Sequence, residues 1–337
     1  MVSNSILVLK GVVIFDLLIC MSASSVYPVY RNYNENFRNL AATSDYVYIG
    51  GNSMIIQLSP SLIYLDQKYV SSDRLTSKYP ENWLLATQNN DSLIACNFNP
   101  KYDALCLKLN SDLSVISNSS NLISNKQATK YLTTTIRNTN ILIIASSMCL
   151  SNAAENKTCN SISSYSLDTF LQRFQPYVDL GNRTYAVEYF QQTKHVTFKA
   201  ILKIEKFIFF VYNTEDGHSK LGKMCTGGVY MRTNAFEDTP IICSRNGKNY
   251  RMAKDAVHWN GYLFVVFSDD STNVICKYKI TNVKAIFMKS RQERLKCPFN
   301  DDTTNVYFKK QKLAGWCFNQ TTRLCQSFLR NVSIRSI

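Results

Sequence analysis

Three histidines are the first side chains to consider for chemistry, because an imidazole can bind a metal or transfer a proton near neutral pH. His195, His218 and His258 each lack a second histidine or a cysteine at the spacing of a metal site. His258 lies in the segment AVHWNGYLF, which is more typical of a strand edge or a core position than of a ligand. The sequence therefore predicts no metal site.

Aspartates could form acid and base pairs, but those of interest in this chain fall in turn-like segments. An aspartate in a turn usually accepts hydrogen bonds from its own backbone, and this role explains Asp45, Asp91, Asp269 and Asp270. The sequence also lacks a nucleophile elbow, a phosphate-binding loop and a dinucleotide fingerprint. We therefore predict that the protein is not an enzyme and uses no cofactor.

Cysteine is the remaining reactive residue type, and the chain contains 11 cysteines. Residues 1–24 include an apolar stretch that ends in small residues, as a cleaved signal peptide does, so Cys20 would be removed. A buried strand is the alternative for this segment. An even number of cysteines then remains, which suits full pairing in a secreted protein but leaves the connectivity open. These are Cys96, Cys106, Cys149, Cys159, Cys225, Cys243, Cys276, Cys297, Cys317 and Cys325.

Asn-x-Ser/Thr sequons mark candidate N-glycosylation sites in a secreted protein. A chain this rich in asparagine, serine and threonine contains several such sequons by chance, so they are compatible with secretion without proving it. The sequons are at Asn90, Asn118, Asn156, Asn182, Asn319 and Asn331.

The chain is strongly basic, with a formal net charge of +14 and an isoelectric point of about 9.2. Such a charge attracts polyanions. The basic residues are scattered, with local clusters only at 289–296 and 309–312, and no nucleic-acid-binding motif surrounds them. We therefore predict no nucleic-acid partner, and a solvated basic surface is the simplest explanation. Sulfated glycans are the polyanions that a secreted protein would meet.

Five segments share one pattern, in which a polar turn leads into a short strand of β-branched or aromatic residues and a second strand follows. The first strands begin at residues 46, 93, 141, 207 and 262, so the steps between them are 47, 48, 66 and 55 residues. Each step is close to the length of one four-stranded propeller blade. A β-sandwich, the competing fold, lacks this longer period. The sequence therefore predicts an all-β propeller.

The expected strands come in pairs. The first strands are Tyr46–Ile49, Leu93–Cys96, Ile141–Ala145, Phe207–Tyr212 and Tyr262–Phe267. The second strands are Met54–Leu58, Ala104–Leu109, Ser161–Leu167, a stretch near Met224 and Val274–Ile280. One short helix is expected at 287–295. No later segment has the roughly 20 apolar residues that a membrane-spanning helix needs, so no membrane span is predicted.

Three segments resemble the sema domain of plexins. Residues 45–62 (DYVYIGGNSMIIQLSPSL) resemble its opening blade, and residues 83–113 resemble its second blade, with Ala-Cys followed by another cysteine about ten residues later. Residues 263–279 (LFVVFSDDSTNVICKYK) resemble the family's apolar strand, Phe-Ser turn and Cys-aromatic strand. Semaphorins and the hepatocyte-growth-factor-receptor group share this fold, but the order of the cysteines is most similar to that of plexins.

The resemblance implies a seven-bladed sema propeller over residues 25–337. Because the chain shows about five repeats, we expect an incomplete propeller that lacks C-terminal blades. The unpaired edges of such a propeller would favour self-association, so we also expect an oligomer.

The resemblance also implies the disulfide pairs. Two of them each close a loop of about ten residues and are plausible on their own, although free buried thiols are the alternative. The implied pairs are Cys96 with Cys106, Cys149 with Cys159, Cys225 with Cys325, Cys243 with Cys276, and Cys297 with Cys317.

By the same resemblance, the protein is expected to be a plexin-like semaphorin receptor ectodomain that binds a semaphorin-like protein in semaphorin–plexin signalling. It would be secreted, or lie at the cell surface as part of a full receptor. The alternative is a secreted structural or decoy protein that binds sulfated glycans or other extracellular partners.

Overall fold

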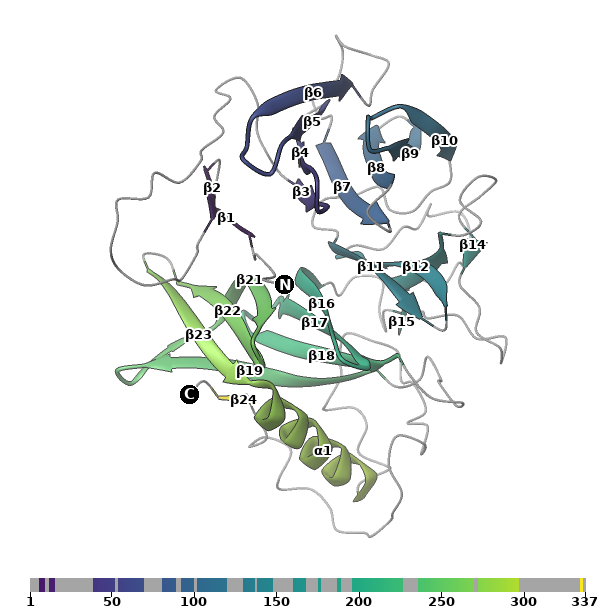
Figure 1. Cartoon of the computed structure of the whole chain (residues 1–337). Coiled ribbons are helices and arrows are strands. Elements are labelled where there is room, and N and C mark those ends of the chain that lie inside the picture. The colour runs from purple at the N-terminus through teal and green to yellow at the C-terminus, as the bar shows by residue number, and fades with distance from the viewer. Residues whose placement is uncertain are drawn as a thin grey trace. The chain divides into compact units, whose positions relative to one another are not determined.

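The computed structural model in Figure 1 describes the strands and the helix of the chain together with some of their connections. The described residues are 6–9, 12–15, 39–51, 54–69, 81–88, 92–99, 102–119, 130–136, 138–147, 160–167, 175–176, 187–188, 196–226, 236–269, 272–296 and 334–335. The chain forms two compact units, Met1–Asn125 with Asp168–Phe174, and Lys126–Leu167 with Gln175–Ile337. Both units are built mainly from antiparallel sheets.

The first unit contains two four-stranded sheets whose strands lie side by side in sequence order. The first sheet consists of β3 (Asn39–Ala42), β4 (Val47–Gly50), β5 (Met54–Leu58) and β6 (Tyr64–Tyr69). The second sheet consists of β7 (Glu81–Gln88), β8 (Ser92–Asn99), β9 (Tyr102–Asn110) and β10 (Val115–Ser119). A separate hairpin of β1 (Ile6–Leu9) and β2 (Val12–Phe15) lies within the predicted signal peptide, whose cleavage stays a prediction.

The second unit contains three more sheets that follow the same order. The third consists of β11 (Lys130–Ile136), β12 (Thr139–Ala145), β13 (Asn160–Ser166), β14 (Gln175–Pro176) and β15 (Val187–Glu188). The fourth consists of β16 (Val196–Ile204), β17 (Phe207–Thr214), β18 (Ser219–Cys225), β19 (Glu237–Arg245), β20 (Lys248–Tyr250) and β24 (Ile334–Arg335), which is parallel to β19. The fifth consists of β21 (Met252–Trp259), β22 (Tyr262–Ser268) and β23 (Asn273–Lys279). Such repeated up-and-down sheets are the blades of a propeller, which confirms the predicted fold class.

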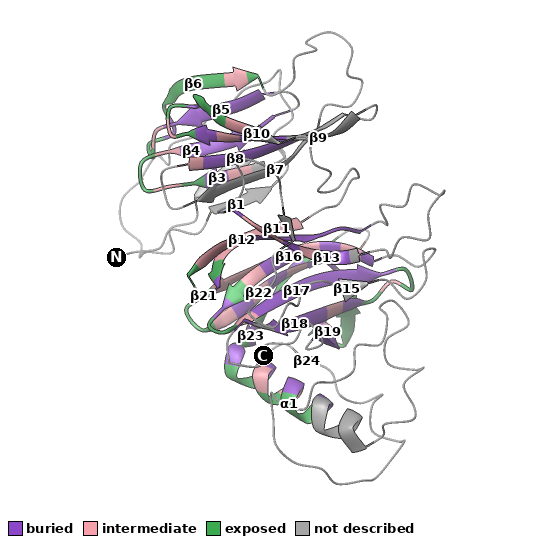
Figure 2. Ribbon diagram, turned by 90° about the vertical axis from the view of Figure 1, so that its right-hand side faces the viewer, coloured by how far each residue is buried: buried purple, intermediate pink, exposed green. Residues whose placement is uncertain are grey.

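The strands that the sequence pattern predicted are the second and third strands of each sheet. All four residues of β4 are buried, and in β17 only Phe207 is partly exposed. Figure 2 shows this burial along the strands. A strand that is buried on both faces has a continuous apolar sequence, which explains why these strands stood out. The first strands are more polar, as in β21, and the sequence pattern did not indicate them.

Hydrophobic side chains fill the space between neighbouring sheets within each unit. In the first unit, Tyr48 and Ile55 pack against Leu93 and Leu109 of the second sheet. In the second unit, one cluster joins the third and fourth sheets, and another joins the fourth and fifth. The fourth sheet therefore contributes apolar residues to a core on each of its two faces, as a propeller blade does.

The helix α1 (Ile280–Lys296) follows β23 directly and is longer than the expected helix at 287–295. Ile280, Val283 and Phe287 recur at helical spacing and are buried in the cluster between the fourth and fifth sheets. The Phe287 ring also contacts the ammonium group of Lys223, whose Nζ lies 4.7 Å from the ring centroid. Lys223 Nζ also lies 3.7 Å from a carboxylate oxygen of Glu237. The buried ammonium group therefore has an ion-pair partner in addition to the aromatic ring above it. The apolar face of the helix therefore belongs to the core.

Buried polar side chains also connect the two sheets of the first unit. Tyr48 Oη donates a hydrogen bond to the carbonyl oxygen of Ser111 at 3.1 Å, and Gln57 Nε2 donates to the same oxygen at 2.6 Å. Ser111 lies in the turn between β9 and β10, whereas Tyr48 and Gln57 belong to β4 and β5. Side chains of the first sheet thus supply both hydrogen-bond donors to a backbone carbonyl of the second sheet.

The same kind of connection joins the fourth sheet to the fifth. Asn213, on β17, donates from Nδ2 to the carbonyl oxygen of Ala253 at 2.9 Å, and its Oδ1 accepts from the Ala253 N–H at 3.1 Å. Ser219 Oγ accepts from the same N–H at 2.8 Å. In return, Tyr278 of β23 donates from Oη to the carbonyl oxygen of Ile242 on β19 at 3.0 Å. Neighbouring sheets therefore complete each other's backbone hydrogen bonds.

We predict that Asn213→Ala lowers the free energy of unfolding by about 1 to 3 kcal/mol, because it leaves a buried backbone carbonyl without its amide donor. Urea denaturation followed by tyrosine and tryptophan fluorescence measures this loss. Asn110→Ala is the matched control, since Asn110 is exposed and bonds only locally to Ser114 Oγ; it should change the free energy of unfolding by less than about 0.5 kcal/mol. Equal losses in the two variants would contradict the role given to Asn213.

Burial raises the pKa of Tyr48 to about 12, whereas an unfolded chain ionises its tyrosines at a pKa of about 10. The neutral phenol is therefore favoured in the folded state, and its contribution to stability is complete below pH 10 and lost as the pH rises toward 12. We predict that Tyr48→Phe makes the fall in the free energy of unfolding between pH 9 and pH 11 shallower, by up to about 1.4 kcal/mol per pH unit. Urea denaturation at several pH values tests this, with Tyr64→Phe at an exposed tyrosine as the control.

Candidate interaction surface

Two of the implied disulfides are present in the structure. Cys96 and Cys106 face each other across the β8–β9 ladder, with their Cα atoms 4.0 Å apart. Cys243 on β19 and Cys276 on β23 link the fourth sheet to the fifth, with their Cα atoms 5.8 Å apart. The second disulfide spans 33 residues and so fixes two sheets covalently.

The other predicted modification sites fall largely outside the described residues. Of Cys225, only the backbone is described, at the end of β18. Asn118 lies on β10 opposite Leu107. The sites outside the described residues are Cys149, Cys159, Cys297, Cys317, Cys325, Asn90, Asn156, Asn182, Asn319 and Asn331. Their pairing and glycosylation stay predictions.

The two histidines that the structure describes do not belong to a metal-binding group. His218 is exposed in the turn after β17, and His258 is half-buried on β21. Burial lowers the pKa of His258, against the opposing effect of the Glu205 carboxylate. His195 lies outside the described residues. Across the part of the chain that the structure describes, no group of three His, Cys, Asp or Glu side chains could hold a metal ion.

Of the two turn aspartates that the structure describes, Asp269 has the expected local role and Asp45 does not. Asp269 Oδ1 accepts a hydrogen bond from the Thr272 N–H at 2.9 Å, as expected for a turn aspartate. In the turn of Asp45 the cap is instead Thr43, whose Oγ1 accepts from the Asp45 N–H at 3.3 Å and from the Tyr46 N–H at 3.0 Å. The threonine is better placed because it begins the turn. Asp91 and Asp270 lie outside the described residues.

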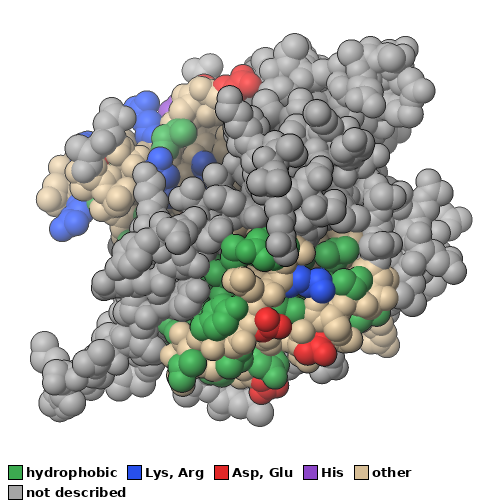
Figure 3. All heavy atoms as spheres, turned by 90° about the horizontal axis from the view of Figure 1, so that it is seen from above, with side chains coloured by type: hydrophobic (Ala, Val, Ile, Leu, Met, Phe, Trp, Pro, Cys, Tyr) green, Lys and Arg blue, Asp and Glu red, His purple; other side chains and the backbone are tan. Residues whose placement is uncertain are grey.

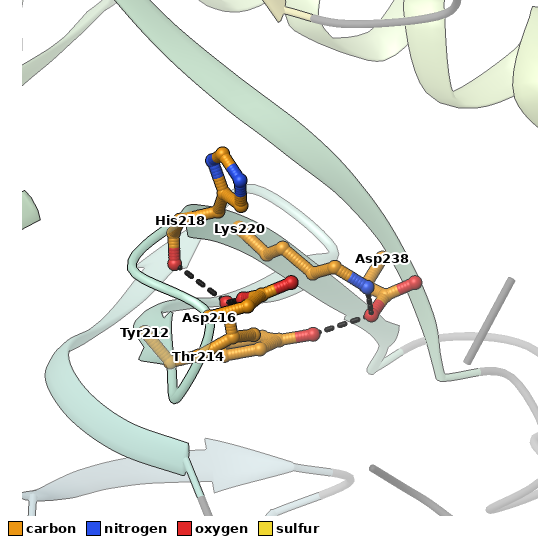
Figure 4. Close-up of polar contacts among 6 residues, drawn as sticks. All are labelled: Tyr212, Thr214, Asp216, His218, Lys220 and Asp238. Atoms are coloured by element: carbon orange, nitrogen blue, oxygen red, sulfur yellow. Dashed lines mark hydrogen bonds and ion pairs between the residues drawn. The ribbon is translucent and has the colours of Figure 1, made fainter. Parts of the chain in front are cut away.

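A buried polar network on the fourth sheet is structural (Figure 4). Tyr212 Oη donates to Asp238 Oδ2 at 2.5 Å, and Lys220 Nζ lies 3.2 Å from the same oxygen. Asp238 is only 1% exposed, and burying a carboxylate so deeply is costly unless it is paired and hydrogen-bonded. The ring of His218 points away from these contacts in Figure 4. The network therefore joins β17, β18 and β19 rather than forming an acid–base pair.

The last strand of the first sheet, together with the residue before it, presents exposed hydrophobic side chains. Ile63 is 65% exposed, Tyr64 and Leu65 are each 46% exposed, and Tyr69 is 39% exposed. We call these four residues the β6 surface. Figure 3 shows hydrophobic side chains exposed among acidic and basic ones on this part of the first unit. Aromatic residues such as tyrosine are common anchors of protein interfaces.

Both outer strands of the first unit contain a β-bulge. In β6, Leu65 is the extra residue between Tyr64 and Asp66, and in β10 it is Ile116, which is 40% exposed. A bulge bends an edge strand and interrupts its row of backbone hydrogen-bonding groups. The β6 surface therefore offers side chains to a partner rather than a continuous strand edge.

The sequence pattern did not indicate the β6 surface. Its residues lie in the segment IYLDQKY, whose apolar and polar residues do not alternate strictly. The one signal was this loss of alternation, which follows from the bulge at Leu65. The sequence pattern predicted only the preceding strand, Met54–Leu58, which is β5.

Comparison with solved structures identifies the architecture. Two structures of the full extracellular region of plexin A4, with domains 1 to 8 and domains 1 to 10, each match 89% of this chain with a TM-score of 0.62 and 15% sequence identity. The chain has a sema-like β-propeller fold. It spans 41% of the first plexin A4 chain and 32% of the second. No protein-family model and no curated protein matches the sequence.

The sema-like fold confirms the family resemblance at the level of architecture. At 15% identity, the agreement is one of strand order and sheet packing rather than of individual surface residues. No described helix is both long enough and apolar enough to cross a membrane.

We predict that non-reducing peptide mass mapping of the purified protein recovers Cys96–Cys106 and Cys243–Cys276 as linked peptides. The same map tests the three remaining pairs, of which Cys225 with Cys325 would join residues far apart in the sequence. Reduced and alkylated protein is the control, because it should yield every cysteine peptide singly. A free thiol at Cys243 or Cys276 would contradict the link between the fourth and fifth sheets.

Proposed function

We propose that the protein acts outside the cell as a plexin-like binding domain, without enzymatic activity, and that its partner is a semaphorin-like protein. The exposed hydrophobic β6 surface is the observation that carries this proposal. Large apolar side chains that gather on the surface of a folded protein commonly mark a protein interface. The sema-like fold and the two disulfides support an extracellular binding domain of this type.

The chemistry of the β6 surface suits a protein partner. Tyr64 and Tyr69 each combine an apolar ring with a hydroxyl group, and Asp66 and Lys68 lie between them on the same strand. Such a mixture of aromatic and charged residues is typical of an interface that forms between proteins which are each stable alone. The net charge of +14 would in addition speed association with an acidic partner.

Surface plasmon resonance with the immobilised protein and a panel of semaphorin ectodomains tests the proposal. At least one semaphorin should bind, and Ile63→Asp should weaken that binding by about tenfold or more, because it places a charge at the interface. Ile275→Asp is a closely matched control, since Ile63 is 65% exposed and Ile275, on β23, is 64% exposed.

Two outcomes would contradict this proposal. Failure of every semaphorin to bind the correctly folded protein would remove the proposed partner. Equal weakening by Ile63→Asp and Ile275→Asp would remove the β6 surface as the contact, because it would trace the loss to added charge alone.

The positive net charge favours a second candidate, a secreted structural or decoy protein that binds sulfated glycans. Heparin chromatography distinguishes the two functions. Elution at a salt concentration far above that of a charge-matched control protein would favour glycan binding. Elution together with the control would favour binding of a protein partner over binding of sulfated glycans.

A further inference from the structure

Three lysines lie on the first strands of the three sheets in the second unit. Lys130 is the first residue of β11, Lys199 lies on β16, and Lys254 lies on β21, where Asp255 follows it. The strands β11 and β16 contact each other, as do β16 and β21 (Figure 1). We call Lys130, Lys199 and Lys254 the first-strand lysine cluster.

Two of these lysines are the extra residues of β-bulges. On β16, Phe198 pairs with Tyr212 and Ala200 pairs with Val211, so Lys199 has no residue opposite it. On β21, Lys254 is bypassed in the same way between Ala253 and Asp255. A bulge redirects a side chain out of the regular alternation of the strand and is common beside functional sites.

Each bulge is held in place by a buried side chain of the preceding sheet. The N–H of Phe198, just before Lys199, donates to Ser147 Oγ at 3.0 Å. The N–H of Ala253, just before Lys254, donates to Asn213 Oδ1 and to Ser219 Oγ, as described above. These three polar residues are at most 5% exposed. The backbone at the two lysines is therefore held in equivalent positions on two strands that contact each other.

Within the described part of the chain, the positive charge of the cluster exceeds the negative charge around it. Among the described residues, none of the three ammonium groups forms an ion pair, and Asp255 is the acidic group with which Lys130 and Lys199 interact electrostatically. Burial lowers the pKa of Lys199, and the charges of Lys254 and Lys130 lower it further. The carboxyl group of Asp255 is reached by solvent, yet partial desolvation raises its pKa. Three cations and one carboxylate thus share a partly desolvated region.

We propose that Lys130, Lys199 and Lys254 bind a tetrahedral oxyanion, sulfate or phosphate, either as the free ion or as an ester group of a larger molecule. Three ammonium groups can donate charge-assisted hydrogen bonds to several oxygens of one such group. A dianion would offset the mutual repulsion of the lysines, whereas chloride carries half the charge and has no set of oxygens to accept these bonds. The carboxylate of Asp255 would repel the anion and so weaken its binding. This site does not depend on the proposed protein partner.

Nuclear magnetic resonance of the reductively ¹³C-dimethylated protein tests the site, because dimethylation keeps the charge of lysine. Signals of the three lysines are assigned from single Lys→Met variants. Sodium sulfate is then titrated at constant ionic strength against sodium chloride. The three signals should shift together along one saturable curve, and Lys199→Met should weaken sulfate binding by about tenfold or more, corresponding to about 1.4 kcal/mol.

Two further variants separate binding from general effects. Lys203→Met, on the same strand, removes a lysine whose Nζ donates to the Thr135 carbonyl oxygen at 3.1 Å and should leave the curve unchanged. Asp255→Asn removes the opposing carboxylate and should strengthen sulfate binding. The absence of a saturable shift, or equal weakening by Lys203→Met and Lys199→Met, would overturn the site.

Stability provides a second readout. Since the folded state lowers the pKa of Lys199, it holds the ammonium form less favourably than the unfolded state does, and this penalty is present at neutral pH. Lys199→Met should therefore raise the thermal midpoint while it weakens sulfate binding. A variant that lost binding because it failed to fold would show the opposite change in midpoint.

The source of the anion is distinguished by parallel titrations with inorganic sulfate, inorganic phosphate and a sulfated heparin disaccharide. Binding of the inorganic ions as tightly as the disaccharide would support a site for the free ion. Much tighter binding of the disaccharide would support a glycan ester, provided that Lys199→Met weakens it equally. Disaccharide binding that is unaffected by Lys199→Met would place the glycan elsewhere and overturn that source.

Discussion

Hydrogen bonds that cross from one sheet to the next are the constraint on which this structure depends. A buried backbone N–H or C=O group without a partner is costly, and the groups at a bulge or a turn cannot find one within their own sheet. Side chains of the adjacent sheet supply these partners at the carbonyl of Ser111 and at the N–H groups of Phe198 and Ala253. The apolar clusters drive the sheets together, and the polar contacts fix how they meet.

The covalent and ionic links act on the same joints. The disulfide between Cys243 and Cys276 spans the fourth and fifth sheets, where Asn213 and Tyr278 also form their hydrogen bonds. The ion pair of Lys223 with Glu237 lies beneath the helix at this joint. The second unit is therefore most strongly held where three kinds of interaction coincide. In the first unit, by contrast, the disulfide Cys96–Cys106 lies within a single sheet.

Much of the fold could be predicted because a buried strand has a nearly continuous run of apolar residues in the sequence. The strands β12, β17 and β22 are apolar along most of their length, and their spacing revealed the repeat. The first strands could not be predicted in the same way. On β16, Phe198 and Ala200 enter different cores although they are two residues apart, because the bulge at Lys199 breaks the alternation on which strand recognition relies. The same break concealed β6 and, with it, the exposed surface around Leu65.

The bulge at Lys199 makes one strand serve two packing layers. Phe198 and Ile201 belong to the layer shared with the third sheet, and Ala200 and Ile204 belong to the layer shared with the fifth. Deletion of the one extra residue would move every side chain after it to the opposite face of the sheet, because side chains alternate between the two faces of a strand. Each of these side chains would then enter the wrong packing layer. Changes of chain length should therefore be tolerated in the connections of this protein and rejected in its first strands, so related proteins can differ widely in their loops while keeping the count of residues in β16 and β21.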